Sequence, residues 1–326
     1  MKDYILKKCK DDNVEIHAHC NSIYCSQRII EVNPAKSCQF HCQYCCVYTQ
    51  EIDNKFIPLT IYEDYPELLE NYIKNDIDRA KTLTFFFSFE TDCLEEGLIK
   101  SGMTERIIKI FQKYELKYFL LTKGRIKDDN IKTLLIDTKN IGQIIVNDTM
   151  PDELIRKKLE PFTATNSERY ELVKFCIEND IPVTVSFSPI LPFYNIEYLM
   201  EKIDKYIILG IKHFRLDMLE LSKDSFKKLA AILPEYENKM RELYFENEPI
   251  INKWKSPITN NFIYRYKPNE HIISDIYFKL KEYIKNKNKD ITLSICDGIV
   301  ANSTIFKTFN VEAYKNGYNC MGIRIK

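Results

Sequence analysis

The feature that most constrains this chain is a group of three cysteines, Cys38, Cys42 and Cys45, which stand at a Cys-x3-Cys-x2-Cys spacing within eight residues. Soft thiolate ligands favour iron–sulfur centres, and a cluster of four irons normally takes four of them. Three thiolates on one loop would bind three irons and leave the fourth open. A small molecule can bind at such an open site and react there, as in catalytic metal sites generally. The spacing therefore predicts a [4Fe–4S] cluster with one reactive iron.

A zinc site is the competing interpretation of the same stretch. Structural zinc takes four Cys or His ligands at close range, and His41 and Cys46 lie beside the three cysteines. A non-catalytic zinc-binding module therefore stays open as an alternative.

The bulk composition indicates a globular protein of the cytoplasm. At 326 residues the chain is long enough for one large α/β domain or a barrel-sized domain with an appendage. The first residues, MKDYILKKCKDDN, lack the apolar core of a secretory signal, and no apolar run approaches the ~20 residues of a membrane span. In a reducing compartment the 11 cysteines serve metal or chemistry better than disulfides. The 47 basic and 47 acidic residues cancel, so no global field attracts a polyanion.

Short apolar runs alternate with amphipathic stretches along the middle of the chain. The expected strands are Thr82–Phe89, Lys117–Thr122, Gln143–Asn147, Val183–Ser188 and Lys212–Asp217. The expected helices are Thr104–Tyr114, Asp129–Ile136, Ser167–Asn179 and Ile196–Leu209. This alternation indicates parallel strands joined by right-handed helical crossovers, hence a barrel or partial barrel.

The last third of the chain has a different pattern. Leu219–Glu248 is expected to be mostly helical, and Pro249–Pro268 an irregular linker or insertion. A helix is expected over Ile272–Lys285 and a late strand over Ile291–Cys296.

Polar residues follow three of the expected strands directly. Asp92 comes after the first strand, Lys123 after the second, and Asn147 ends the third. In βα architectures the groups that bind ligands lie at the carboxyl ends of the strands. An acid such as Asp92 could accept hydrogen bonds from an ammonium group, and Lys123 could pair with a carboxylate. Each of the three residues is equally compatible with an ordinary turn or surface position.

Several strings along the chain, taken in order, resemble one known family. They are VNPAKSCQFHCQYC, FSFETD followed by MTERIIKIF, FLLTKG, and LEPFTATNSERYELVKFCIENDIPVTVSFSPILP. Together they resemble the spore photoproduct lyase branch of the radical S-adenosylmethionine (SAM) enzymes from about Glu31 to Leu221. The resemblance implies a partial (β/α)6 TIM-type barrel. It divides the chain into an N-terminal extension (1–30), the radical SAM core barrel (31–221) and a C-terminal region (222–326) that selects the substrate.

The resemblance also implies cofactors, partners and site residues. Cys38, Cys42 and Cys45 would bind the [4Fe–4S] cluster, and SAM would bind the open iron. Tyr44 would pack by the adenine, and the SAM pocket would include Asp92, Lys123, Asn147 and Ser186. An electron donor of the flavodoxin or ferredoxin type would supply the electron that cleaves SAM to methionine and a 5′-deoxyadenosyl radical.

The chain departs from that branch at two positions. Lyases of the branch have Tyr directly after the last cluster ligand and a hydrogen-donating Cys three residues before the Asp that corresponds to Asp92. This chain has Cys46 and Phe89 there. Repair of thymine dimers is thereby put in doubt, while the radical-generating part is intact. Cys46 and Cys93 are the thiols nearest the expected chemistry and are candidate hydrogen-atom donors, although small buried apolar residues are the usual fate of free Cys.

Four other cysteines raise the question of a second metal site. Cys9, Cys20, Cys25 and Cys320 lie near the two ends of the chain and could close an auxiliary cluster or a zinc site if the ends meet. Their irregular spacing is equally compatible with no metal.

Basic and aromatic residues are interleaved between Lys253 and Lys289. Trp254, Phe262, Tyr264 and Tyr266 alternate with lysines and arginines, and the span holds only three acids. This pattern suits phosphate contacts with base stacking, although lysine-rich faces are more often simply solvated.

The sequence therefore predicts a lyase-like radical SAM enzyme. Its substrate is expected to be a small molecule or a peptide, with a DNA lesion or another nucleic acid as the alternative.

Overall fold

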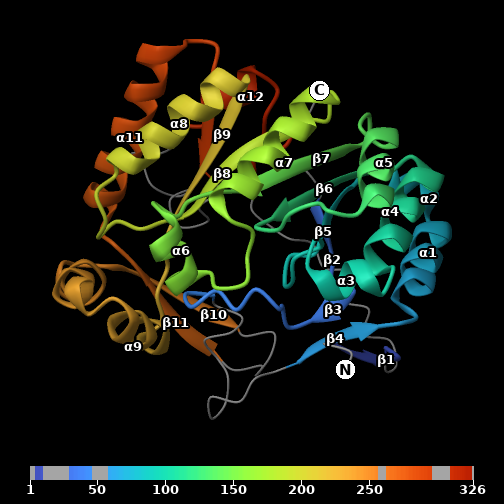
Figure 1. The fold of residues 1–326 in the computed structure, drawn as a ribbon, viewed down its shortest axis with the longest axis horizontal. Coiled ribbons are helices and arrows are strands. Elements are labelled where there is room, and N and C mark those ends of the chain that lie inside the picture. The colour runs from blue at the N-terminus through green and yellow to red at the C-terminus, as the bar shows by residue number, and fades with distance from the viewer. Residues whose placement is uncertain (1–3, 10–28, 46–57, 256–261, 296–308, 325–326) are drawn as a thin grey trace. The chain divides into compact units, whose positions relative to one another are not determined.

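The computed structural model describes residues 4–9, 29–45, 58–255, 262–295 and 309–324. Seven strands form one sheet in the order β12-β9-β8-β7-β6-β5-β2 (Figure 1). Their bounds are β2 Ile29–Val32, β5 Thr84–Phe87, β6 Lys117–Thr122, β7 Gly142–Asn147, β8 Val183–Ile190, β9 His213–Met218 and β12 Thr292–Ile295. The strands run parallel, and helices connect them. The predicted partial TIM-type barrel is thus confirmed.

The helices that follow the sheet strands lie close to their expected positions. They are α3 Glu96–Lys100, α4 Met103–Tyr114, α5 Asp129–Asp137, α6 Glu153–Leu159, α7 Asn166–Glu178 and α8 Glu197–Leu209. The short helices α3 and α6 were not among the expected elements. Before β5 stand α1 Tyr65–Asn75 and α2 Ile77–Ala80. After β9 come α9 Lys223–Ile232, the 3-10 turn η2 Pro234–Tyr236, α10 Glu237–Arg241, the π-helix η3 Glu242–Glu246, α11 Glu270–Lys287 and α12 Val311–Lys315.

The chain divides into two compact units. The first unit comprises Met1–Phe40, Phe56–Val146 and Ser167–Val183, and the second comprises His41–Lys55, Asn147–Asn166 and Thr184–Lys326. These units do not follow the expected division at residues 30 and 221, which stays a prediction.

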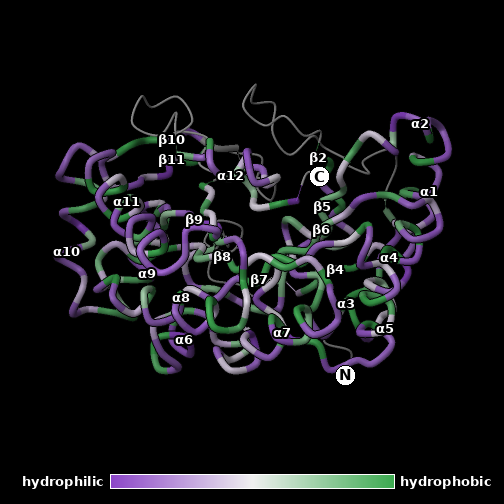
Figure 2. Tube along the Cα trace, turned by 90° about the horizontal axis from the view of Figure 1, so that it is seen from above, coloured by the Kyte–Doolittle hydropathy of each residue, from purple (hydrophilic) through white to green (hydrophobic). Residues whose placement is uncertain are grey.

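In the first unit, aromatic strands pack against amphipathic helices. All four residues of β5 are buried, and the ring of Phe86 stacks on that of Phe119 of β6 at 4.4 Å. Helix α4 buries Ile107, Ile108 and Phe111 on one face, as its 3.6-residue apolar periodicity requires. The hydrophobic colouring of β5 and β6 in Figure 2 contrasts with the hydrophilic α2. A small second sheet, of β1 Tyr4–Lys7, β4 Leu59–Tyr62 and β3 Ala35–Lys36, leads into the cysteine loop.

In the second unit, one expectation is wrong. Pro249–Pro268 is not irregular, because β10 Ile250–Lys255 and β11 Phe262–Lys267 pair as an antiparallel ladder. The physical reason is the share of aromatic and β-branched residues in FIYRYK, which favours a strand, while the pairing with β10 satisfies its backbone groups. The late strand is confirmed over Thr292–Ile295, while Cys296 lies outside the described residues.

A buried histidine joins β9 to β12 in this unit. The Nδ1 atom of His213 lies 2.7 Å from the Thr292 hydroxyl and its Nε2 atom 2.9 Å from the Ser294 hydroxyl, while the ring stacks on Tyr318 at 4.1 Å. Burial lowers the pKa of His213 from its ordinary 6.5 to about 3. The ring is therefore neutral in the folded protein across the physiological range.

We predict that this histidine makes the protein less stable as the pH falls below 6.5. The unfolded chain protonates His213 near its ordinary pKa, whereas the folded chain does so only near pH 3, so the unfolded state binds more protons between these values. The free energy of unfolding should drop by about 1.4 kcal/mol per pH unit in that window from this group alone. Urea unfolding of the wild type and His213→Gln at several pH values measures it. The variant should be less stable at pH 7.5 and have the shallower slope between pH 4 and 6; parallel slopes would contradict the assignment.

Candidate functional site

The first part of the cysteine loop, in the first unit, is held against the start of helix α3. The backbone N–H of Gln39 donates to Oε2 of Glu95 at 2.7 Å, and the Gln39 side-chain oxygen accepts from the N–H of Gly97 at 2.9 Å. A Cβ added at Gly97 would collide with Leu59 and approach the Gln39 oxygen to 3.1 Å. These reciprocal bonds fix the backbone next to Cys38.

Glu95 is a buried carboxyl beside the first predicted iron ligand. Burial raises the pKa of Glu95 to about 8. The hydrogen bonds that Glu95 forms with the Gln39 backbone and the Cys38 side chain act in the opposite direction and lower this pKa. Near neutral pH this carboxyl therefore holds its proton for much of the time.

The second part of the loop, in the second unit, is held by α6 and the residues after it. The N–H of Cys45 donates to the carbonyl of Cys42 at 2.9 Å, which closes a turn between the two ligands. The N–H of Gln43 donates to the carbonyl of Leu159 at 2.8 Å, and the Tyr44 hydroxyl donates to the buried carboxylate of Glu160. Tyr44 is only 8% exposed. That its ring packs by the adenine of SAM stays a prediction.

The donor set of this loop fits an iron–sulfur cluster. Cys38, Cys42 and Cys45 form no disulfide within the described part of the chain. Among the described residues, no three His, Cys, Asp or Glu side chains gather around one point as a single metal ion requires. A four-iron cluster makes no such demand, since each thiolate binds a different iron.

Asp92 connects the loop after β5 to the end of β6, both in the first unit. Its Oδ1 accepts from the Thr122 hydroxyl at 2.7 Å and the Leu94 N–H at 3.0 Å, and its Oδ2 accepts from the Lys123 N–H at 2.7 Å. Burial raises the pKa of Asp92, although these hydrogen bonds oppose the shift. The structure thus brings together Asp92 and Lys123, two of the predicted site residues, and holds the Lys123 backbone in place.

Several buried polar atoms in the residues after β5 have no hydrogen-bond partner within the described part of the protein. Within the described residues, the hydroxyls of Ser88 and Thr91 and Oε1 of Glu95 are buried without a hydrogen-bond partner. Such atoms are rare in native proteins and point to a bound water or ligand. Since they stand at the carboxyl end of a barrel strand, they fit a polar cosubstrate there. Sequence analysis missed Ser88 and Glu95, because nothing in the sequence signals burial without a partner.

In the second unit, the residues after β7 have the same character. Oδ2 of Asp148 accepts from Lys202 at 2.8 Å and from the Tyr206 hydroxyl at 2.7 Å, which ties the strand end to α8. Oδ1 of Asp148 and the hydroxyl of Thr149 are buried without a hydrogen-bond partner in the described part of the chain. The predicted Asn147 is itself only 2% exposed.

Ser186 lies within β8 in a charged setting of the second unit. Its hydroxyl accepts from Nη1 of Arg215 at 3.1 Å, and Nη2 of Arg215 donates to Oδ2 of Asp217 at 3.1 Å. The N–H of Asp148 donates to the Ser186 carbonyl at 3.0 Å. Sequence analysis did not weigh Arg215 or Asp217, although both stand on β9 near its carboxyl end.

The structure bears differently on the two candidate hydrogen donors. Cys93 is fully buried, and burial raises the pKa of its thiol well above the usual value, which makes it a core residue here. Cys46 lies outside the described residues, as do Cys20 and Cys25 of the suggested second metal site. The role of each stays a prediction.

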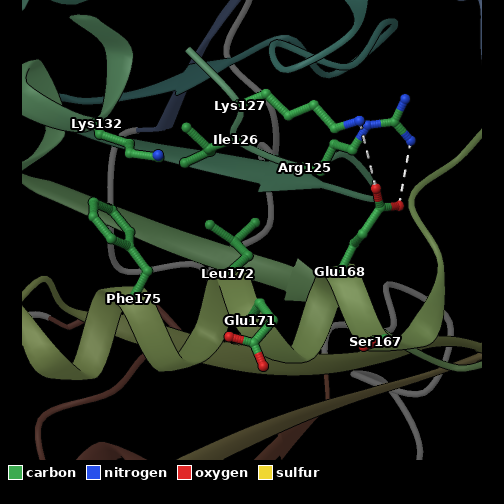
Figure 3. Close-up of a pocket in the computed structure, with 9 residues that line it drawn as sticks. All are labelled: Arg125, Ile126, Lys127, Lys132, Ser167, Glu168, Glu171, Leu172 and Phe175. Atoms are coloured by element: carbon green, nitrogen blue, oxygen red, sulfur yellow. Dashed lines mark hydrogen bonds and ion pairs between the residues drawn. The ribbon is translucent and has the colours of Figure 1, made fainter. Parts of the chain in front are cut away.

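A cavity of about 340 Å³ lies between α7 and the loop after β6 (Figure 3). Glu168 of α7 reaches toward that loop, with its carboxylate 3.3 Å from Arg125 Nη1 and 3.9 Å from Lys127 Nζ. None of the predicted site residues lines the cavity. Its ion pairs anchor the loop that begins at Lys123, and both elements belong to the first unit.

A parallel sheet with unsatisfied buried polar groups after its strands, and a loop of three thiols that follows its first strand in the chain, are features of an iron–sulfur enzyme of the barrel type. The pattern of the Radical SAM superfamily matches residues 32–206, more than half of the chain. The chain belongs to that superfamily, and its cofactors are accordingly a [4Fe–4S] cluster and SAM.

Solved structures of two kinds share the fold. A spore photoproduct lyase complexed with dinucleoside spore photoproduct has 12% identity and a TM-score of 0.63, covering 90% of this chain and 82% of the lyase. A double mutant of the lyase with bound AdoMet and dinucleoside spore photoproduct has 13% identity and a TM-score of 0.57, covering 81% and 75%. Streptococcus suis SuiB bound to S-adenosylmethionine has 10% identity and a TM-score of 0.55, covering 90% of this chain but 55% of SuiB. The search of curated proteins found no match.

No helix in the described ranges is both long enough and apolar enough to span a membrane.

We predict that Gly97→Ala loosens the cysteine loop. The added methyl group meets Leu59 and the Gln39 side chain, so the two hydrogen bonds that hold Gln39 must shift. Overpacking of this kind costs about 1–3 kcal/mol. Urea unfolding should show that loss, and iron bound per chain after anaerobic reconstitution should fall. Glu96→Ala, at an exposed position of the same helix, is the control and should change stability by less than about 0.5 kcal/mol. Equal iron content in the two variants would contradict the view that the Gln39 hydrogen bonds hold the cysteine loop in place.

Proposed function

We propose that this protein is a radical SAM enzyme acting by hydrogen-atom abstraction from a small-molecule or peptide substrate. The observation that carries the proposal is the three-thiol loop inside the matched superfamily region, together with the unsatisfied buried polar atoms that follow β5. When bound, the cluster and SAM supply a 5′-deoxyadenosyl radical after one-electron reduction. The chain's own residues supply binding, orientation and exclusion of water.

Particular residues take these roles in the proposal. Cys38, Cys42 and Cys45 bind three irons. The hydroxyls of Ser88 and Thr91 form hydrogen bonds with polar groups of SAM. Asp92 holds the backbone of Lys123, and the Lys123 ammonium pairs with the carboxylate of SAM. The roles of Asn147 and Ser186 in SAM binding stay predictions of the sequence resemblance. The protein would work in the cytoplasm, since the cysteines that the structure describes form no disulfide. A flavodoxin- or ferredoxin-type protein would donate the electron.

We predict that anaerobically reconstituted protein holds about four irons and four sulfides per chain. With SAM and a strong reductant it should form 5′-deoxyadenosine, measured by chromatography. Cys42→Ala should lose most of the iron and the product, whereas Cys176→Ala, at a buried cysteine of α7 outside the site, should keep both. About one zinc per chain with no sulfide would support the zinc module instead.

Nucleic acid is the second candidate substrate, as a lesion or base in a lyase-like reaction. Strand β11 exposes Phe262 (60%) and Tyr264 (56%), and the Lys253 ammonium lies 4.4 Å from the Phe262 ring centre. Exposed rings beside a cation suit base stacking. Fewer basic side chains of this stretch are available to phosphate than the sequence indicates. Lys267 is buried against Asp217 and Glu220, and Arg265 pairs with Glu220 at 2.6 Å. The side chain of Lys255 lies outside the described residues.

We predict that, if nucleic acid is the substrate, the chain shifts single-stranded or irradiated DNA in a gel and the affinity falls with salt. Phe262→Ala with Tyr264→Ala should then weaken binding by about 10-fold or more, since each stacked ring contributes about 1–3 kcal/mol. Ile208→Ala, at an exposed position of α8, is the control. Absence of a shift at low salt favours the small-molecule or peptide substrate.

A further inference from the structure

The segment formed by α6 and the three residues after it lies directly against the second part of the cysteine loop, within the second unit. Leu159 accepts the hydrogen bond from the Gln43 N–H at 2.8 Å, and Glu160 accepts from the Tyr44 hydroxyl. The ring of Phe162 packs edge-on against His41 at 5.6 Å. Gln43 and Tyr44 lie between the ligands Cys42 and Cys45. This segment therefore provides protein surface immediately next to two of the iron ligands.

The outward side of this segment is apolar and basic. Leu154 is 65% exposed and Phe162 is 62% exposed, which is unusual for large apolar side chains. Lys157 and Lys158 are both exposed, and they follow Leu154 at the three- and four-residue spacing that puts side chains on one helical face. We call these four residues the α6 face.

The acids close to this face are largely engaged. Glu153 pairs with the buried Arg156 at 2.7 Å, and the Asp152 side chain caps the helix by accepting from the Ile155 N–H at 2.8 Å. The third acid, Glu160, is buried against Tyr44. Lys157 and Lys158 thus place two exposed positive charges about one helical turn from Glu160.

We propose that the α6 face is the docking surface for a small acidic one-electron carrier of the flavodoxin or ferredoxin type. The proposal rests on the proposed function, because it names the surface at which that reaction receives its electron. In the step served, the carrier is oxidised by one electron and SAM is reduced by one electron. A carbon–sulfur bond of SAM breaks, which gives methionine and the 5′-deoxyadenosyl radical.

Three properties of the face match such a partner. Positive side chains attract an acidic protein and raise the rate of encounter, most strongly at low salt. Exposed Leu154 beside the lysines, and exposed Phe162 against His41, supply the apolar side chains that interfaces combine with charged ones. Redox encounters bury little surface, so a short helix with its following turn is large enough.

The test compares two reductants on one charge-reversed variant. In Lys157→Glu with Lys158→Glu, 5′-deoxyadenosine formation driven by a reduced bacterial flavodoxin should fall on the order of 10-fold at low ionic strength. Formation driven by dithionite, which needs no docking surface, should equal that of the wild type, and so should the iron content. Phe162→Ala should also slow only the flavodoxin-driven reaction.

Lys279→Glu with Lys289→Glu, at exposed positions on and just after α11, is the matched control and should leave both reactions unchanged. The wild-type rate with flavodoxin should fall as salt is raised, and the variant's rate should depend less on salt.

The proposal is overturned if the α6 variant keeps the wild-type rate with flavodoxin, or if it loses the dithionite-driven reaction equally. It is also overturned if neither flavodoxin nor a bacterial ferredoxin reduces wild-type protein that dithionite does reduce. Failure of the proposed function gives a different result, since the wild type then forms no 5′-deoxyadenosine with any reductant.

Discussion

The structure depends first on how the backbone of the cysteine loop is held. Three thiolates can bind one cluster only if their backbone positions are fixed, and a loop has no ladder of its own to fix them. In the first unit, Gln39 exchanges hydrogen bonds with Glu95 and Gly97. In the second unit, Gln43 and Tyr44 bond to the end of α6. Each part of the loop is thus bound to a helix terminus, and the α3 contact leaves no room for a side chain at position 97.

The same units accept an energetic penalty at their strand ends. A buried polar atom without a hydrogen-bond partner costs roughly 1–3 kcal/mol, and Ser88, Thr91, Glu95, Asp148 and Thr149 each contribute one. Proteins tolerate such atoms where a ligand later satisfies them. A polar ligand that forms hydrogen bonds to such atoms would recover that free energy as affinity.

The sequence was sufficient for the strands of the sheet and for the superfamily. Apolar runs such as TFFF are buried in the sheet, and the closely spaced thiols pointed to the superfamily whose pattern matches residues 32–206. That the three thiols are the cluster ligands stays a prediction. The site around them could not be predicted equally well. That Ser88 lacks a partner, or that Lys267 is buried against Asp217 rather than exposed to phosphate, depends on segments distant in sequence. The β10–β11 pair was missed because an aromatic stretch was expected to be irregular, although aromatic and β-branched residues favour strands.

Buried charge connects β11, in the region predicted to select the substrate, to the carboxyl end of β9 in the second unit. Lys267 of β11 lies 3.6 Å from Asp217 Oδ1 and 3.2 Å from Glu220 Oε1, while Asp217 Oδ2 accepts from Arg215, which also donates to Ser186. Removing one partner of a buried pair leaves an uncompensated charge and costs more than the pair contributes. A change of substrate specificity by substitutions in the hairpin must therefore keep Lys267 or replace its partners with it, because otherwise the disturbance reaches Ser186 through Arg215.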